Sequence, residues 1–144
     1  MSVSKVRKAF VGAVKDQVAL LDPVLPVAWP NVKFNPPSNS PWLAFHWVPA
    51  DSGAATMGDG GEDELVGFVQ VDVNVPQDSG EAATETVLTA LENHFIAGRE
   101  VINDSQVATV VSSSRSSGRA VDPYWRTSLT INFYARITRP TITA

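Results

Sequence analysis

The sequence predicts an α+β fold: a mainly antiparallel sheet of about four to five strands, with two helices packed on one face. Apolar and polar residues alternate over residues 65–75 and again over residues 125–137, which is typical of strands with one buried side. Apolar residues at steps of three and four predict helices over residues 3–21 and 83–95. Helices on one face of an antiparallel sheet fit this order of elements.

A proline-rich segment, residues 23–41, follows the first predicted helix. Its six prolines forbid a helix and restrict any strand to short edge pieces such as residues 32–34. We therefore expect an extended connection along the surface, held to the core near its two ends by Trp29 and Trp42. Residues 42–48 then predict the first full strand, with aromatic and valine side chains on both faces.

Residues 50–64 are rich in glycine and acidic side chains and predict a mobile loop between two antiparallel strands. The acids lack the regular Asp-x-Asp-x-Asp-Gly order of a calcium loop, so we predict no dedicated metal site. Two interpretations remain. The loop is either a solvated hairpin tip or, as we prefer, an arm that becomes ordered against a neighbouring subunit.

The centre of the chain is a strand that leads into a helix. One side of residues 65–75 is apolar, whereas polar residues such as Asp72 make the other side partly wet. Pro76 cannot donate to a sheet ladder and should end the strand. Asp78, with Glu81 three positions later, has the pattern of a capping box, so we expect the second helix to begin there.

The C-terminal third predicts two more strands. Residues 106–111 form the first of them, after a connection over residues 99–105. A serine-rich segment with Arg115 and Arg119 follows, and we expect a mobile loop over residues 112–120. No aromatic residue in it could stack on a base, so it is a weak nucleic-acid contact. It is a flexible hairpin tip or an edge that meets a partner's carboxylates.

Length and composition place further limits on the chain. Its 144 residues fit a single domain over residues 1–144. The longest apolar runs are too short to cross a bilayer, and no secretory signal opens the sequence, so we expect no membrane contact and a cytoplasmic place of synthesis. A net charge of −4 opposes general attraction to phosphate backbones, so we predict no sequence-specific nucleic-acid partner.

The sequence carries no catalytic signature. There is no cysteine, no HExxH, no GxSxG and no phosphate-binding GxxxxGK[ST]. His46 lies between aromatic residues in a predicted strand, and we expect a packed, hydrogen-bonded core residue there. His94 lies late in a predicted helix. We therefore predict a protein that is not an enzyme and that needs no cofactor.

Four stretches carry a resemblance to a known family. They are the opening VSKVRKAFVGAV, the proline-rich VAWPNVKFNPP with the following WLAFHWVP, the unit VGFVQVDVNVPQDSGEAATETVLTALENHF, and the terminal WRTSLTINFYARI. In this order they resemble the tail terminator (tail completion) proteins of long-tailed bacteriophages and prophages. The resemblance extends over residues 3–138 and rests on the order of the elements and the residue pattern of each.

The resemblance implies a structural role. Such proteins form a ring, commonly of six subunits, that caps the head-proximal end of the tail tube, stops its polymerisation and offers a head-tail joining surface. The implied partners are further copies of the chain, the tail tube protein and the head-tail connector protein. The implied location is the virion tail, after assembly in the cytoplasm of a host bacterium. The alternatives are a head-tail connector or minor tail protein, and a small non-phage binding module.

A closed ring needs contacts between two different surfaces of the subunit. Complementary charge on the two loops would favour a single register. We therefore expect the charged residues of both loops at subunit or tube interfaces: Asp51, Asp59, Glu62, Asp63, Glu64, Arg115 and Arg119.

Overall fold

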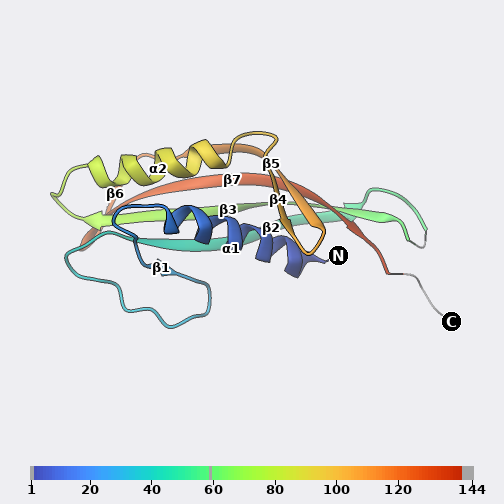
Figure 1. Ribbon diagram of the computed structural model, residues 1–144, viewed down its shortest axis with the longest axis horizontal. Coiled ribbons are helices and arrows are strands. Elements are labelled where there is room, and N and C mark those ends of the chain that lie inside the picture. Colours follow the sequence, from blue (N-terminus) through green and yellow to red (C-terminus); the bar gives the residue numbers. More distant parts are fainter. Residues whose placement is uncertain (1, 59, 141–144) are drawn as a thin grey trace.

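A computed structural model describes residues 2–58 and 60–140 (Figure 1). Its elements follow the chain in this order: α1 (Val3–Ala19), β1 (Val27–Ala28), β2 (Trp42–Ala54), β3 (Glu62–Pro76), α2 (Ala82–His94), β4 (Glu100–Asn103), β5 (Gln106–Arg115), β6 (Arg119–Val121) and β7 (Tyr124–Thr138).

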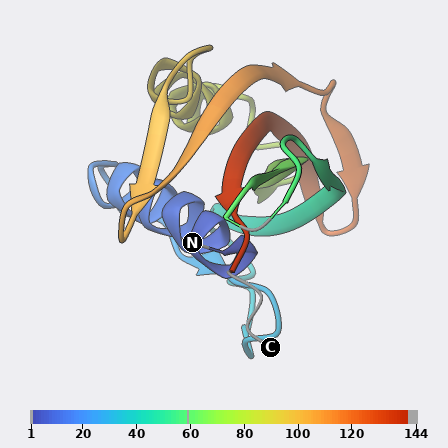
Figure 2. The same cartoon turned by 90° about the vertical axis from the view of Figure 1, so that its right-hand side faces the viewer.

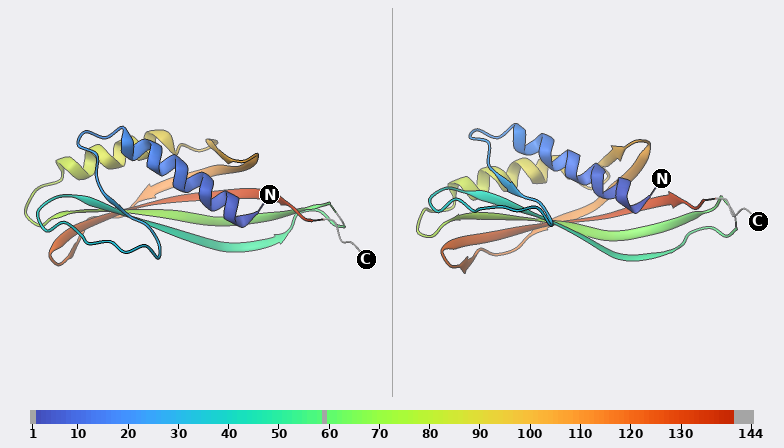
Figure 3. Two further views of the ribbon diagram at one scale, coloured as in Figure 1. Left: turned by 60° about the horizontal axis from the view of Figure 1, so that its bottom comes forward. Right: turned by 90° about the horizontal axis from the view of Figure 1, so that it is seen from below.

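Within the described chain the strands form one seven-stranded sheet of order β1-β2-β3-β7-β5-β4, with β6 paired to β7. Each pair is antiparallel except β1 and β2, which are parallel. The α+β class and the two helices on one face are confirmed (Figure 3). The predicted count of four to five mainly antiparallel strands was too low, because β1, β4 and β6 are too short to produce a readable alternation.

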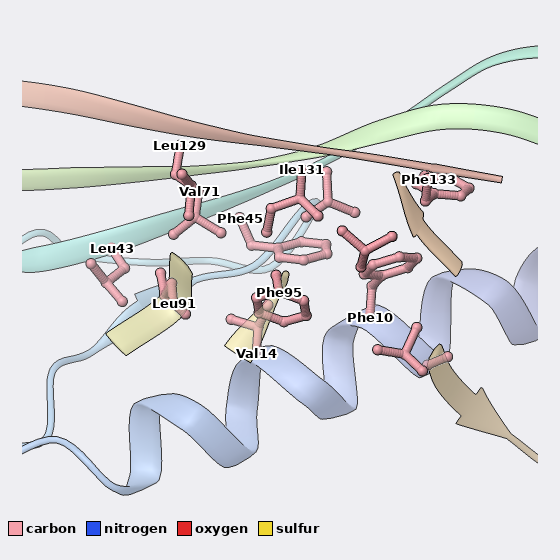
Figure 4. Close-up of a cluster of buried hydrophobic side chains, with 14 of the residues drawn as sticks. Phe10, Val14, Leu43, Phe45, Val71, Leu91, Phe95, Leu129, Ile131 and Phe133 are labelled. Atoms are coloured by element: carbon pink, nitrogen blue, oxygen red, sulfur yellow. The ribbon is translucent and has the colours of Figure 1, made fainter. Parts of the chain in front are cut away.

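The sheet is strongly curled when it is seen end-on, with both helices on one side (Figure 2). The core fills the space between these helices and the sheet (Figure 4). Phe10 of α1 is fully buried, and its ring centroid lies 4.8 Å from that of Phe133 in β7 and 6.3 Å from that of Phe95 after α2. Offset aromatic contacts of this kind add to the burial of apolar area.

The two helices begin in different ways. Ser2 caps α1, because its hydroxyl accepts a hydrogen bond from the backbone N–H of Lys5. The predicted capping box at Asp78 was wrong, since α2 begins at Ala82 without a side-chain cap. Asp78 instead adopts a positive φ of 65° in the turn after β3. Pro76 ends the strand, and the chain needs this turn before it can enter the helix.

Both segments predicted as loops contain strand. Only residues 55–61 connect β2 to β3, and the two strands form one long hairpin that extends past the helices (Figures 1 and 3). Residues 112–115 belong to β5 and pair with β7, and residues 119–121 form β6. Serine and glycine weaken a strand signal in sequence, but pairing with the long β7 supplies backbone hydrogen bonds that hold these residues in the sheet.

The proline-rich segment contains one short strand, at a different place from the expected one. Residues 32–34 are not strand, whereas β1 pairs with Leu43 and Ala44 of β2. Both tryptophans hold the segment to the folded body as expected: Trp29 packs against Phe45 of the core, and the buried Trp42 contacts Phe34 and Tyr124. No helix in the described residues is long and apolar enough to cross a membrane.

Candidate interaction surfaces

The β2–β3 hairpin, residues 50–64, carries acidic side chains at the start of β3; we call it the acidic hairpin. Asp63 accepts a hydrogen bond from Arg139, with Oδ1 2.6 Å from Nη1. Glu64 lies opposite Arg136 in β7, and the Oε2 to Nε distance is 3.3 Å. Arg139 also donates to the backbone carbonyls of Thr56 and Gly58. The end of β7 therefore holds the hairpin and neutralises part of its charge.

The remaining acids of this hairpin are Glu62, Asp51 and Asp59, and only for Glu62 is the side chain described. The backbone carbonyl of Glu62 accepts from Arg139, but its carboxylate has no ion-pair partner among the described residues. Asp51 lies in β2 opposite Val66. The side chain of Asp51, and Asp59 as a whole, lie outside the described part of the chain. Glu62 is thus the described acid of the hairpin that is available to a partner.

Arg115 lies at the end of β5 and is held by α2. Its Nη1 is 2.8 Å from Oε1 of Glu85, and its Nε is 3.2 Å from Oε2 of Glu92. Hydrogen bonds to these two carboxylates raise the pKa of Arg115 above its usual range, so the guanidinium stays charged. The structure gives Arg115 an intramolecular role, and its role at a subunit interface stays a prediction.

Arg119 lies in β6 directly opposite Arg126 of β7. Its Nη2 is 3.4 Å from the Ser128 hydroxyl, whereas Arg126 donates from Nε to Oδ1 of Asn74 at 2.7 Å. Neither arginine has an ion pair among the described residues. Our sequence reasoning missed Arg126, although the alternation of the last strand places it on the polar side with Ser128 and could have indicated it.

The side of the sheet opposite the helices carries a buried carboxylate; we call this side the polar face. Asp72, 3% exposed, accepts hydrogen bonds from Ser128 (2.6 Å) and Gln70 (2.8 Å), and its Oδ2 lies 2.9 Å from Nε2 of His46. Burial alone would raise the pKa of Asp72, but these hydrogen bonds and the nearby histidine outweigh it and hold that pKa below its ordinary value.

His46 differs from the core residue that the sequence predicted. It is hydrogen-bonded as predicted, but half of its side chain is exposed and it does not belong to the core. Even-numbered residues of this part of β2 point away from the helices, because their neighbours Leu43 and Phe45 fill the core. His46 and Ser128 both contact Asp72, and the hydrogen bonds among the described residues do not join them to each other. The arrangement therefore lacks the nucleophile–base contact of a catalytic triad.

No group of three histidine, aspartate or glutamate side chains in the described chain is arranged to hold a metal ion. What the geometry offers instead is two charged surfaces at the ends of a long curled sheet. The acidic hairpin lies at one end, and the β6–β7 hairpin with Arg119 and Arg126 lies at the other (Figure 1). Such surfaces fit protein association better than the binding of a small ligand.

The model of one protein family, described as phage tail terminator protein, matches residues 5–133 of the chain. The chain belongs to the phage tail terminator family. The recognised resemblance is thereby confirmed, and this tail terminator protein has a structural role in a phage tail. As a tail component it belongs to the virion and interacts with other tail proteins.

Two further comparisons bear on this tail terminator. A solved structure matches it with a TM-score of 0.77 and 25% sequence identity. The match covers 97% of this chain and 99% of the other. No curated protein matches it. The shared fold agrees with the family match. The residues of the two charged surfaces are identified from this structure alone.

Proposed function

We propose that this protein forms a ring, with six subunits as the expected number, that caps the head-proximal end of the tail tube. The cap stops tube polymerisation and gives the head-tail connector a surface on which to join. The observation that carries the proposal is the family match over residues 5–133. The two different charged surfaces support it, because a ring closes through contacts between unlike surfaces.

The acidic hairpin and the basic residues are the proposed contact regions of the ring. The set includes Asp51, Asp59, Glu62, Asp63, Glu64, Arg115 and Arg119, of which Glu62 and Arg119 lack a carboxylate–cation partner among the described residues. A side chain without an internal ion pair breaks no such pair when it binds another subunit, and its cost is the loss of hydration. These two positions are therefore the strongest members of the set.

The experiment that tests the proposal measures tube length. Tail tube protein is polymerised with and without this protein, and tube lengths are read from negatively stained images. A terminator gives tubes of bounded length with a ring at one end, and its omission gives tubes of unbounded length. Light scattering on the isolated protein should show a species of about 93 kDa, which is six copies of the 15.5 kDa chain. Tubes of equal length with and without the protein would overturn the proposal.

A head-tail connector or minor tail protein is the second candidate, and the family's place in the tail is what favours it. Such a protein would bind head-side proteins without changing tube length. The same experiment separates the two candidates, because only a terminator limits the tube. The third expectation, a small non-phage binding module, has no support from the family match.

A further inference from the structure

A row of hydrogen-bond donors crosses the polar face at the β6 end of the sheet. Trp42 of β2 lies opposite Asn74 of β3, Asn74 opposite Arg126 of β7, and Arg126 opposite Arg119 of β6. Cross-strand partners project from the same face with their Cβ atoms about 5 Å apart. We call these four residues the donor row.

The donor row has more donors than acceptors. Arg126 donates to Oδ1 of Asn74, which directs the other end of that amide, Nδ2, away from Arg126. This buried Nδ2 has no hydrogen-bond partner in the described chain, and neither has the buried Nε1 of Trp42. Buried donors are normally paired, so two unpaired ones show that the donors of the row outnumber the acceptors that the described residues supply.

The two arginines add uncompensated charge to the row. Like charges directly opposite each other on neighbouring strands disfavour folding, and an anion placed between them would remove that repulsion. The nearest carboxylate of the polar face, Asp72, is already satisfied by Ser128, Gln70 and His46. Its distance from either guanidinium exceeds the 4 Å of an ion pair. Among the described residues, no carboxylate of the same chain forms an ion pair with the row.

The proline-rich segment packs against the tryptophan end of the donor row. Phe34 packs on the ring of Trp42, with the centroids 5.2 Å apart, and Tyr124 meets that ring edge-on. The hydroxyl of Tyr124 donates to the backbone carbonyl of Pro37 at 2.6 Å. These contacts hold the tryptophan end of the row closed, so an incoming anion meets the row at its arginine end.

We propose that the donor row is a docking site for the acidic hairpin of a second copy of this chain, with Glu62 entering between Arg119 and Arg126. Charge complementarity identifies the occupant: residues 50–64 carry five acidic and no basic residues. Of the three acids whose side chains are described, Glu64 and Asp63 pair with Arg136 and Arg139, and Glu62 has no ion pair. Within one subunit Glu62 and Asn74 are about 40 Å apart along β3, at roughly 3.3 Å per residue. The contact is therefore intermolecular and joins the two ends head to tail.

This inference rests on the proposed ring and specifies the contact between its neighbouring subunits. A head-to-tail contact uses two different surfaces of each copy, as ring closure demands. Every subunit then contributes one acidic hairpin and one donor row.

A cysteine pair tests the contact directly, because the natural chain has no cysteine. The chain with Glu62→Cys and Arg119→Cys is oxidised with and without tail tubes, and its products are separated under non-reducing conditions. We expect a ladder of disulfide-linked oligomers, since a disulfide requires Cα atoms within about 7 Å. The matched control pairs Glu62→Cys with Lys8→Cys on the exposed side of α1 and should give on the order of tenfold less linkage. Monomer alone in both conditions, or equal ladders in the two variants, would overturn the proposal.

Charge reversal gives a second, independent readout. Arg119→Glu with Arg126→Glu should abolish the 93 kDa species expected for about six chains, and adding Glu62→Arg should restore part of it. Arg7→Glu with Lys8→Glu changes charge by the same amount on α1 and should leave the mass unchanged. Bounded tube length without cross-linking would overturn this site while leaving the terminator role intact. Loss of DNA binding together with an unchanged 93 kDa species, about six chains, in the reversed variant would show that the arginines serve a phosphate instead.

Discussion

Arg139, just after β7, and Asp63, near the start of β3, form an ion pair in which Nη1 and Oδ1 are 2.6 Å apart. The same guanidinium donates to the carbonyls of Glu62 and Gly58. One side chain thus fastens the start of β3 and the residues that connect it to β2 to the end of β7. The hairpin reaches past the helices, so this fastening replaces the core contacts that hold the rest of the sheet.

Replacement of Arg139 by Ala should therefore loosen the hairpin more than it weakens the whole protein. We expect a loss of about 1 kcal/mol in the free energy of unfolding, because the pair is only partly buried. Amide exchange should rise at residues 55–58 and 60–61 and stay unchanged in β7. Lys5→Ala, which removes the exposed pair with Asp104, is the matched control. Unchanged exchange at the connecting residues would show that Arg139 does not hold them.

Arg115 gives the second prediction, which separates folding from assembly. Its ion pairs with Glu85 and Glu92 join the end of β5 to α2. Arg115→Glu should lower the free energy of unfolding by about 1–2 kcal/mol, through two lost surface pairs and new repulsion. Urea unfolding measures this loss, and Arg119→Glu should leave stability within about 0.5 kcal/mol of wild type. Equal stability losses in the two variants would contradict this division of roles.

The long elements could be predicted from the sequence because each has many residues of one period. The alternation in β3 and β7 and the spacing of Val6, Phe10, Val14 and Val18 in α1 each repeat several times, and all three elements are confirmed. Strands of two to four residues cannot show a period. They are strands because they pair with the longer β2, β5 and β7, and this pairing leaves no period in the short segments themselves.

The candidate surfaces were less predictable, for a related reason. Arg115 and Arg119 look alike in a serine-rich stretch, but only the tertiary fold brings Glu85 and Glu92 to the first of them. The alternation of residues 65–75 predicts that Asp72 lies on a face partly exposed to solvent. In the structure Ser128 and its neighbours bury it. Burial of a polar residue depends on partners distant in sequence, and a local pattern does not contain them.

The Asp72 network makes stability depend on pH. The folded-state pKa of Asp72 lies below its ordinary value of 3.8, so its contribution is fully present above that value. The contribution is lost as the pH falls through the folded-state pKa. Asp72→Asn should cost about 2 kcal/mol at pH 7, because the donors of Ser128 and Gln70 lose a charged acceptor. Thermal unfolding from pH 7 to pH 2.5 should show the two proteins converging in acid. A constant difference across that range would contradict the assignment.

Gly67 gives the last prediction, and the chain supplies its control. A Cβ at Gly67 would lie 2.6 Å from the backbone carbonyl oxygen of Val48 and 3.0 Å from Cα of Pro49, where β2 bulges. Neither neighbour is a flexible side chain, so Gly67→Ala must displace the backbone of β2 and should cost about 1–3 kcal/mol. Gly12 lies inside α1 with open space around it, and Gly12→Ala should stabilise by up to about 1 kcal/mol. Urea unfolding of the two variants measures opposite shifts. The bulge sets the direction of the acidic hairpin. Gly67→Ala should therefore also reduce disulfide cross-linking when it is added to the chain with Glu62→Cys and Arg119→Cys. Gly12→Ala in the same chain should leave cross-linking unchanged.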